Sequence, residues 1–202
     1  MITLFGAPGA GKTVQGKLLA EKYGWTWVSY RDLLMNLHNR EISFALEHGM
    51  FIDAKEATKV VDEALERLAK SSKRLILDGF PADYRQVQWL IDSGRIKDLE
   101  GAIVLRVPRG ELWRRLVARK RVDDTRAAIE RRQDLYDRNI TGMIRTLTMN
   151  GIEVREVDGG NEPKDVLERI DGVLADWGMV PKKQFEDISE QVRPVLAEYP
   201  QH

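Results

Sequence analysis

The stretch Ile2-Thr3-Leu4-Phe5-Gly6-Ala7-Pro8-Gly9-Ala10-Gly11-Lys12-Thr13 decides the fold of this chain. Residues 2–5 form a short apolar run that predicts a buried strand, and residues 12–23 predict a helix. The glycines between them lack a Cβ, so the chain can turn tightly and bring backbone N–H groups to an anion. The helix that follows directs the positive end of its dipole to the same place. This order of elements predicts a phosphate-binding loop.

The loop also supplies side chains suited to a bound triphosphate. Lys12 is long enough to reach the β- and γ-phosphates, and the hydroxyl of Thr13 is placed to ligate Mg²⁺. The alternative is a glycine-rich turn that precedes a helix and binds no phosphate. We therefore expect ATP to be bound by a set of loop residues, namely Gly9, Ala10, Gly11, Lys12, Thr13 and Val14.

The composition is that of a compact enzyme and excludes several other classes of protein. The length of 202 residues suits one α/β domain, and a hydrophobic content of 43% is enough for a sizeable core. The 32 basic residues balance the 32 acidic ones, which argues against a general nucleic-acid binder. The chain has no cysteine, so disulfides, thiol catalysis and zinc–thiolate sites are excluded. No apolar run has the length of a signal peptide or a membrane span, which predicts a cytoplasmic protein.

Strands and helices alternate along the chain. Such alternation predicts an α/β fold of the P-loop NTPase type, with a parallel five-stranded sheet and helices on both faces. In such sheets ligands lie beyond the C-terminal ends of the strands. The predicted strands cover residues 2–5, 25–29, 74–78, 101–107 and 152–157. The predicted helices cover residues 12–23, 31–47, 54–70, 83–93, 109–119, 123–138, 140–149 and 162–176.

Asp78 opens a second informative motif, Asp78-Gly79-Phe80-Pro81, at the end of the third of these apolar runs. A carboxylate that leaves a buried strand beside the phosphate loop is well placed to hold Mg²⁺, directly or through water. The alternative is a helix N-cap or a turn residue. With Thr13, Asp78 therefore completes the predicted metal site.

Several motifs in order resemble the adenylate kinase branch of the nucleoside monophosphate kinases. The resemblance runs from residue 2 to about residue 176, and 177–202 lies outside it. It implies transfer of the γ-phosphoryl group of ATP to AMP or a similar monophosphate, with Mg²⁺ as cofactor. It also implies a small helical acceptor-binding insertion at residues 30–59. The motifs are Gly6–Thr13, Glu21-Lys22-Tyr23-Gly24, Asp78–Pro81 with Gln86, Arg121-Val122-Asp123-Asp124 and Val157-Asp158-Gly159.

The same resemblance implies a role for the basic residues, because phosphoryl transfer needs positive charge around the transferred group. It implies that Lys12, Arg119, Arg121 and Arg132 are catalytic, and that Arg115 and Arg119 bind ATP. Asp123 and Asp124 should open the helix that carries Arg132 and orient the arginines. The lid is vestigial, at 119–122, because only Lys120 separates Arg119 from Arg121. The alternative is a solvated helix face, which we expect for Arg114, Arg126 and Arg131.

The acceptor side departs from the family pattern. Met35 and Ala82 stand where the family carries arginines that bind the acceptor phosphate. Arg31 and Arg85 lie about one helical turn from these positions and are candidates to replace them, or else they are surface arginines. The residues implied to bind the acceptor are Tyr30, Arg31, Met35, Ile52, Gly79, Arg85 and Gln86.

Two other classes of function stay open because of these departures. One is a nucleotide-binding protein of the same fold with weak or no kinase activity, acting as a sensor or regulatory module. The other is a P-loop kinase with a non-nucleotide acceptor. The partners we expect are small-molecule nucleotides, with no nucleic acid and no membrane, for a monomeric chain.

The tail at 177–202 has its apolar residues at helical spacing, which predicts an amphipathic helix after a short linker. It either packs back onto the core or contacts a partner. These apolar residues are Phe185, Ile188, Val192, Val195 and Tyr199.

Overall fold

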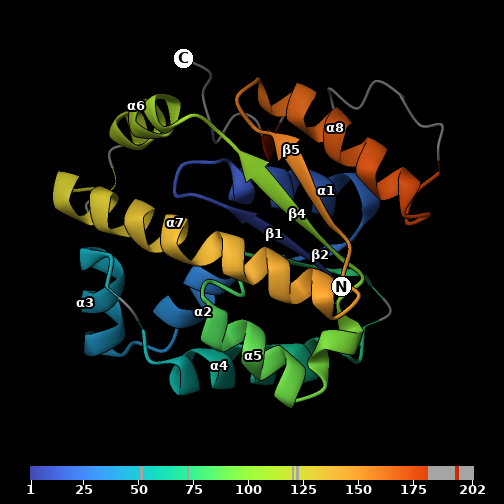
Figure 1. Ribbon diagram of the computed structural model, residues 1–202, viewed down its shortest axis with the longest axis horizontal. Coiled ribbons are helices and arrows are strands. Elements are labelled where there is room, and N and C mark those ends of the chain that lie inside the picture. The colour runs from blue at the N-terminus through green and yellow to red at the C-terminus, as the bar shows by residue number, and fades with distance from the viewer. Residues whose placement is uncertain (51, 72, 120, 122, 182–193, 196–202) are drawn as a thin grey trace.

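A parallel five-stranded sheet forms the centre of the computed structural model (Figure 1). The structure describes residues 1–50, 52–71, 73–119, 121, 123–181 and 194–195. The strand order β2-β3-β1-β4-β5 places the first strand in the middle, and every neighbouring pair is parallel, which confirms the predicted fold class. The strands are β1 (Ile2–Gly6), β2 (Thr26–Ser29), β3 (Leu75–Asp78), β4 (Gly101–Arg106) and β5 (Val154–Asp158).

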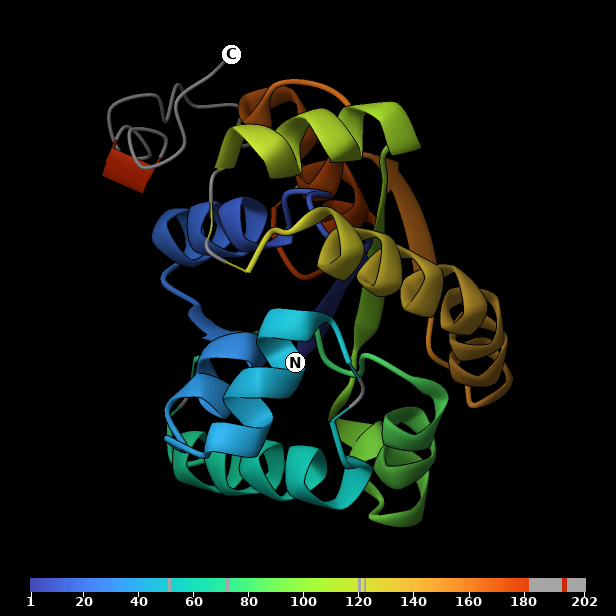
Figure 2. The ribbon, with the colours of Figure 1, turned by 90° about the vertical axis from the view of Figure 1, so that its left-hand side faces the viewer.

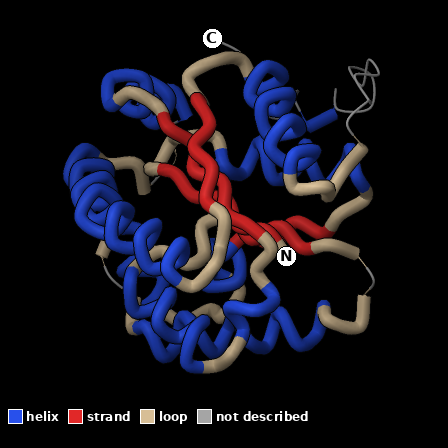
Figure 3. Tube along the Cα trace, turned by 45° about the vertical axis from the view of Figure 1, so that its right-hand side comes forward, coloured by secondary structure: helices blue, strands red, loops and turns tan. Residues whose placement is uncertain are grey.

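Helices cover both faces of this twisted sheet (Figure 3). Because side chains alternate along a strand, β4 sends Ile103 and Leu105 to one face and Ala102 and Val104 to the other. The first pair packs in a core cluster with α1 (Lys12–Tyr23) and α8 (Pro163–Asp176). The second pair packs with α5 (Tyr84–Asp92) and α7 (Arg126–Met149). The central strands of the sheet are therefore buried on both faces.

The insertion between β2 and β3 contains three helices, α2 (Tyr30–Met35), α3 (Arg40–His48) and α4 (Ala54–Leu68). The prediction of one helical region over 31–47 was wrong, because residues 36–39 separate α2 from α3. Asn39 causes the second start: its side-chain oxygen accepts from the N–H groups of Glu41 and Ile42, at 2.8 and 3.3 Å.

The predicted boundary between helices at 123–138 and 140–149 was also wrong. The structure has one helix, α7, which continues because Ile140, Met143 and Leu147 extend its buried face. The helix begins after Thr125, whose hydroxyl oxygen accepts from the N–H of Ala128 at 3.2 Å. Asp123 and Asp124 therefore do not open the helix; they lie in the turn between α7 and α6 (Arg109–Arg119).

The described chain after α8 packs against the core. Val180 is buried, and the Trp177 ring covers Gly101 so closely that a Cβ there would lie 2.7 Å from ring atoms. Val195 packs against the same cluster as α1 and α8. Phe185, Ile188, Val192 and Tyr199 of the predicted tail helix lie outside the described residues, so that helix and the boundary at 176 stay predictions.

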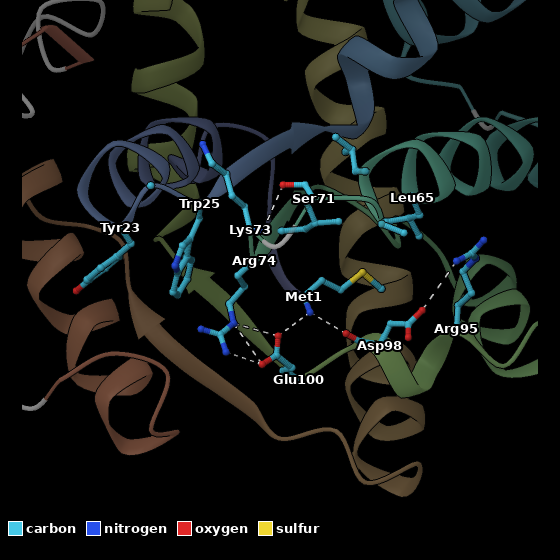
Figure 4. Close-up of a pocket in the computed structure, with 14 residues that line it drawn as sticks. Met1, Tyr23, Trp25, Leu65, Ser71, Lys73, Arg74, Arg95, Asp98 and Glu100 are labelled. Carbon is cyan, nitrogen blue, oxygen red and sulfur yellow. Dashed lines mark hydrogen bonds and ion pairs between the residues drawn. The ribbon is translucent and has the colours of Figure 1, made fainter.

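An ion-pair network joins the N-terminal ends of the strands, at the end of the sheet opposite to residues 6–13 (Figure 4). The Arg74 guanidinium donates to both oxygens of Glu100 at 2.8–3.2 Å, and the Met1 ammonium approaches Glu100 at 2.7 Å. These residues line a cavity with Trp25 and Leu65. The hydrogen bonds from Arg74 and the nearby ammonium group outweigh burial and lower the pKa of Glu100 to about 2.

Glu100→Gln should destabilise the protein in a pH-dependent manner. Because folding lowers the pKa of Glu100 from 4.5 to about 2, its contribution is complete above pH 4.5 and is lost as the pH falls through 2. The carboxylate is partly exposed, so we expect a loss of about 1 kcal/mol or less at pH 7. Urea unfolding of both proteins at pH 7 and pH 3 measures this difference. A difference that is independent of pH would contradict the assignment.

Candidate active site

The phosphate loop connects β1 to α1 and is shaped by backbone that L side chains rarely adopt. Gly9 and Gly11 have φ angles of +88° and +94°, in the left-handed region. Gly11 is also the N-cap of α1, and no side chain within the described residues caps that helix start. Gly9 has a second constraint, because a Cβ there would lie 3.0 Å from Cγ of Leu116 and 3.1 Å from the carbonyl oxygen of Leu112. The loop is therefore held against α6.

The side chains of Lys12 and Thr13 meet the end of β3. Lys12 Nζ donates to the carbonyl oxygens of Gly6 and Ala7 at 2.7 and 3.1 Å, so the lysine lies across its own loop. The Thr13 hydroxyl donates to Oδ2 of Asp78 at 2.7 Å. Burial raises the pKa of Asp78 and lowers the pKa of Lys12, while the attraction between the two charges opposes both shifts. The structure thus brings the predicted metal residues together beside the predicted catalytic lysine.

The segment after β3 is fixed to the central strand. Gly79 follows Asp78, and a Cβ on it would lie 4.0 Å from Cε of Lys12. The fully buried Thr3 donates through its hydroxyl to the carbonyl oxygens of Leu77, at 3.3 Å, and Phe80. Sequence reasoning missed this role of Thr3, although a hydroxyl inside a short buried strand was a usable signal.

Two carboxylates organise the arginines between α6 and α7. Arg119 donates to both oxygens of Asp124 at 2.7 and 2.8 Å, and Arg132 Nη1 donates to the same carboxylate at 3.1 Å. Arg132 also donates to the backbone carbonyl of Asp123. Burial alone would raise the pKa of Asp124, but the hydrogen bonds and charges of Arg119 and Arg132 lower it. After burial, the positive charge of Arg119 also contributes to lowering the pKa of Lys12, so Arg119 lies close enough to act on the phosphate loop.

A third arginine reaches this turn from the insertion. Arg31 Nη2 lies 3.0 Å from Oδ2 of Asp123, whose side chain is 8% exposed. Arg121 forms no ion pair with the described residues, and its pKa is lowered by desolvation and then by the like charges of Arg119 and Arg31.

The arginine cluster, defined as Arg31, Arg119, Arg121 and Arg132, has more positive charge than its carboxylates neutralise. Arg31, Arg119 and Arg132 pair with the carboxylates of Asp123 and Asp124, and Arg121 adds a charge that no ion pair within the described residues neutralises. The four guanidinium groups therefore exceed the two carboxylates by two positive charges (4 − 2). Such an excess next to a phosphate loop suits a polyanionic ligand.

Arg115 brings the motif 157–159 to the same loop. Its Nε donates to Glu111 at 2.6 Å, and its Nη1 donates to the carbonyl oxygen of Gly159 at 2.9 Å. A Cβ on Gly159 would lie 3.3 Å from the carbonyl oxygen of Ala10. Val14, by contrast, packs half-buried against the core. Within the described residues, the expected solvated arginines Arg114 and Arg126 form ion pairs only with neighbours on their own helices, Glu111 and Glu130.

Three of the predicted acceptor residues, Tyr30, Ile52 and Gln86, come together between the insertion and α5. Gln86 donates to the Tyr30 hydroxyl at 3.0 Å, and Ile52 packs half-buried against the cluster that contains Tyr30. Met35 is half-buried at the end of α2. Arg85 pairs with Asp83 at 2.8 Å, and its side chain is 53% exposed. Of the two candidate replacement arginines, Arg31 therefore lies in the arginine cluster and Arg85 pairs at the start of α5.

The insertion packs against α7 at the end of α3 (Figure 2). Arg131 Nε donates to the carbonyl oxygen of His48 at 2.7 Å. A Cβ on Gly49 would lie 2.7 Å from the carbonyl oxygen of Ala128 and 2.9 Å from Cγ of Arg132. Arg131, which sequence reasoning left on a solvated face, thus links the insertion to the helix that carries Arg132.

Comparison with known proteins agrees with this arrangement. The family model described as "Adenylate kinase" matches residues 4–152. The adenylate kinase of Micrococcus luteus is 32% identical over 181 residues, which are 83% of this chain and 86% of the relative. The adenylate kinase of Fusobacterium nucleatum is 31% identical and covers 98% of this chain and 85% of its own length. The chain belongs to the adenylate kinase family.

Membership of the adenylate kinase family confirms the resemblance and the enzyme class, a phosphotransferase of the nucleoside monophosphate kinase type. It also confirms a P-loop kinase as the setting for residues 6–13. None of the relatives or the family model favours the sensor alternative. Within the described residues, no helix has both the length and the apolar character needed to cross a membrane.

Gly9→Ala and Gly11→Ala should differ in stability although both glycines have a positive φ. An alanine in the left-handed region costs about 1–3 kcal/mol at either position. The Cβ at position 11 would meet no atom within 4 Å, whereas at position 9 it would press on Leu116 and Leu112. Overpacking adds about 1–3 kcal/mol at position 9 only. Urea unfolding compares the two variants, and equal losses would contradict the packing of the loop against α6.

Proposed function

We propose that this adenylate kinase family member transfers the γ-phosphoryl group of ATP to AMP or a close analogue, giving two diphosphates. The observation that carries the proposal is the arginine cluster joined by Asp123 and Asp124, which has an excess of positive charge and whose member Arg119 acts on the charge of Lys12. A transferring phosphoryl group spreads negative charge over its oxygens and needs mainly positioning and positive charge from the protein. The phosphate loop positions the donor, and the guanidinium groups opposite it supply the positive charge.

The roles of the donor-side residues follow from their places. Backbone N–H groups at the start of α1 hold the triphosphate, and Arg115 orients the donor from its contact with Gly159. Lys12, Arg119, Arg121 and Arg132 stabilise the transferred group. The residues assigned to ATP are Gly9, Ala10, Gly11, Lys12, Thr13, Val14, Arg115 and Arg119.

Thr13 and Asp78 fit a magnesium ion. Their oxygens lie 2.7 Å apart beside the loop, and hard oxygen ligands of this kind are those that Mg²⁺ prefers, with phosphate oxygens and water as the others. When bound, the ion would neutralise charge on the phosphates and help to orient them. Thr13 and Asp78 hold it in place.

The acceptor site differs from the family pattern in which arginine takes the phosphate. Arg31 reaches Asp123 at 3.0 Å from one turn before Met35, so its guanidinium group joins the arginine cluster. Arg85 pairs instead with Asp83, at 2.8 Å, at the start of α5. We therefore assign binding of the acceptor phosphate to Arg31, and we assign Arg85 a smaller contribution to that binding. Gln86 is assigned to the acceptor base, with adenine as the leading candidate.

The proposal extends to the partners and the oligomeric state of the protein. Small-molecule nucleotides are the partners, and we propose a monomeric protein without nucleic-acid or membrane ligands. A cytoplasmic location stays a prediction of the sequence.

Diphosphate release should separate this proposal from the alternatives. We expect the wild-type protein with ATP and Mg²⁺ to form ADP from AMP faster than from GMP, CMP or UMP. Lys12→Ala should lower kcat by at least 10²-fold, the size expected when one cation at the transferred group is removed. Exposed Lys97, mutated to Ala, is the matched control and should leave kcat unchanged. A wild-type protein that phosphorylates none of the four monophosphates would contradict the proposal.

Arg31→Ala should raise KM for AMP by roughly 10- to 100-fold, because a charge-assisted hydrogen bond is worth about 1.5–3 kcal/mol. KM for ATP should stay the same, and Arg85→Ala, a matched loss of a guanidinium group, should change KM for AMP much less. Met35→Arg added to Arg31→Ala should restore part of the affinity, since the two residues are one turn apart. Steady-state kinetics with both substrates varied measure these effects. Equal KM values for AMP in wild type and Arg31→Ala would rule out the assignment.

A further inference from the structure

A buried hydrogen-bonded chain joins α2 to α5 beside the phosphate loop. Gln86 is 2% exposed, and its Oε1 accepts from the N–H of Ala82 at 2.7 Å while its Nε2 donates to the Tyr30 hydroxyl at 3.0 Å. Because an amide oxygen only accepts and an amide nitrogen only donates, the backbone N–H of Ala82 fixes which way the amide faces. The Tyr30 hydroxyl then holds the nitrogen end.

The Tyr30 ring is itself held in place. Its centroid lies 5.4 Å from that of Phe80 with the planes tilted by 59°, and Phe80 is 1% exposed. Phe80 follows Gly79, which faces Lys12, so Tyr30 borders the site. Burial raises the pKa of Tyr30, with a smaller contribution from Asp83, and the hydroxyl therefore keeps its proton at neutral pH.

The chain leaves two buried donors without a partner. The Tyr30 oxygen accepts from Gln86, but its own proton finds no acceptor among the described residues. The second N–H of the Gln86 amide likewise has no acceptor in the described part of the structure. Asp83, the carboxylate whose charge acts on Tyr30, already accepts from the Gln86 backbone N–H at 3.1 Å and from Arg85 at 2.8 Å. Buried donors without partners cost free energy, so a site that contains two of them is suited to a ligand that accepts.

We propose that Tyr30 is the specificity-determining residue of the acceptor site. Its hydroxyl holds the Gln86 amide in one orientation and donates its own proton to an acceptor atom on the base of the monophosphate. A base that presents a hydrogen atom or a donor at this point leaves the pair unsatisfied and is rejected, because unpaired buried polar groups discriminate strongly. This inference rests on the proposed function and extends it from the phosphate to the base.

Tyr30→Phe tests the inference, because it keeps the ring against Phe80 and removes only the hydroxyl. The measurement is kcat/KM for AMP, GMP, CMP and UMP at saturating ATP. We expect the ratio between the best and the worst acceptor to fall roughly tenfold, the size of one neutral hydrogen bond, through KM for the preferred monophosphate. KM for ATP should not change, a pattern that general damage to the fold would not produce.

Two further variants sharpen the result. Tyr23→Phe is the matched control: it removes a hydroxyl that donates to Asp171 at 2.8 Å, between α1 and α8, and should leave the ranking of acceptors unchanged. Gln86→Asn shortens the amide so that it no longer reaches Tyr30, and it should lose the same discrimination. If the pair acts as a unit, the double variant loses no more than the worse single variant. Should Tyr30→Phe fail to fold, as judged by thermal unfolding, Gln86→Asn alone decides.

The outcomes separate this inference from the proposed function. An unchanged ranking of acceptors in an active Tyr30→Phe overturns the inference and leaves the kinase function intact. A wild-type protein that phosphorylates none of the four overturns the proposed function instead. In that second case, the selectivity of binding is measured by how far each monophosphate raises the midpoint of thermal unfolding. Loss of that preference in Tyr30→Phe supports the role of the hydroxyl, and its retention overturns it.

Discussion

The main constraint on this structure is that positively charged arginines must lie side by side although they repel one another. Arg119 and Arg132 carry like charges, and the two buried carboxylates of Asp123 and Asp124 hold them together at the turn between α6 and α7. Arg121 lies close enough to Arg119 for their like charges to repel. Breaking a buried pair leaves an uncompensated charge and typically costs about 3–5 kcal/mol, so the positions of both carboxylates matter for the fold as well. Electrostatic attraction therefore fixes the turn between α6 and α7. The positive charge that the two carboxylates do not neutralise remains available to a ligand.

The same constraint fixes the short connection between α6 and α7. Arg119 ends α6 and pairs with Asp124 just before α7, so the two helices are joined through side chains as well as through the backbone. The insertion approaches this turn from the other side through Arg31 and through the contact of Arg131 with His48. The insertion is therefore linked both to the arginine cluster and to α7. Met35 stands where the resemblance implies an arginine, and Arg31, one turn earlier, is the guanidinium group that reaches Asp123.

Much of this could be predicted from the sequence because it depends on local order. The alternation of apolar runs and helical segments gave the sheet, and the glycines, Lys12 and Thr13 follow one another along the chain. The errors lie where one side chain decides the local geometry. Asn39 starts a new helix inside a region of uniform helical pattern, and Thr125 starts α7 later than its acidic residues suggest. Contacts between distant residues, such as Arg31 with Asp123 or Tyr30 with Gln86, need the three-dimensional fold and leave no signal in spacing.

The most direct test is the affinity for a bisubstrate analogue, two nucleosides joined through a chain of phosphates, in wild type and in Asp124→Asn. Two effects oppose each other in this variant. Removal of a negative charge would strengthen anion binding if the arginines stayed in place, whereas release of Arg119 and Arg132 would weaken it. We expect a Kd at least about tenfold higher in Asp124→Asn, because positioning of the arginines outweighs charge. A Kd that is equal or lower would contradict the central role of the two carboxylates.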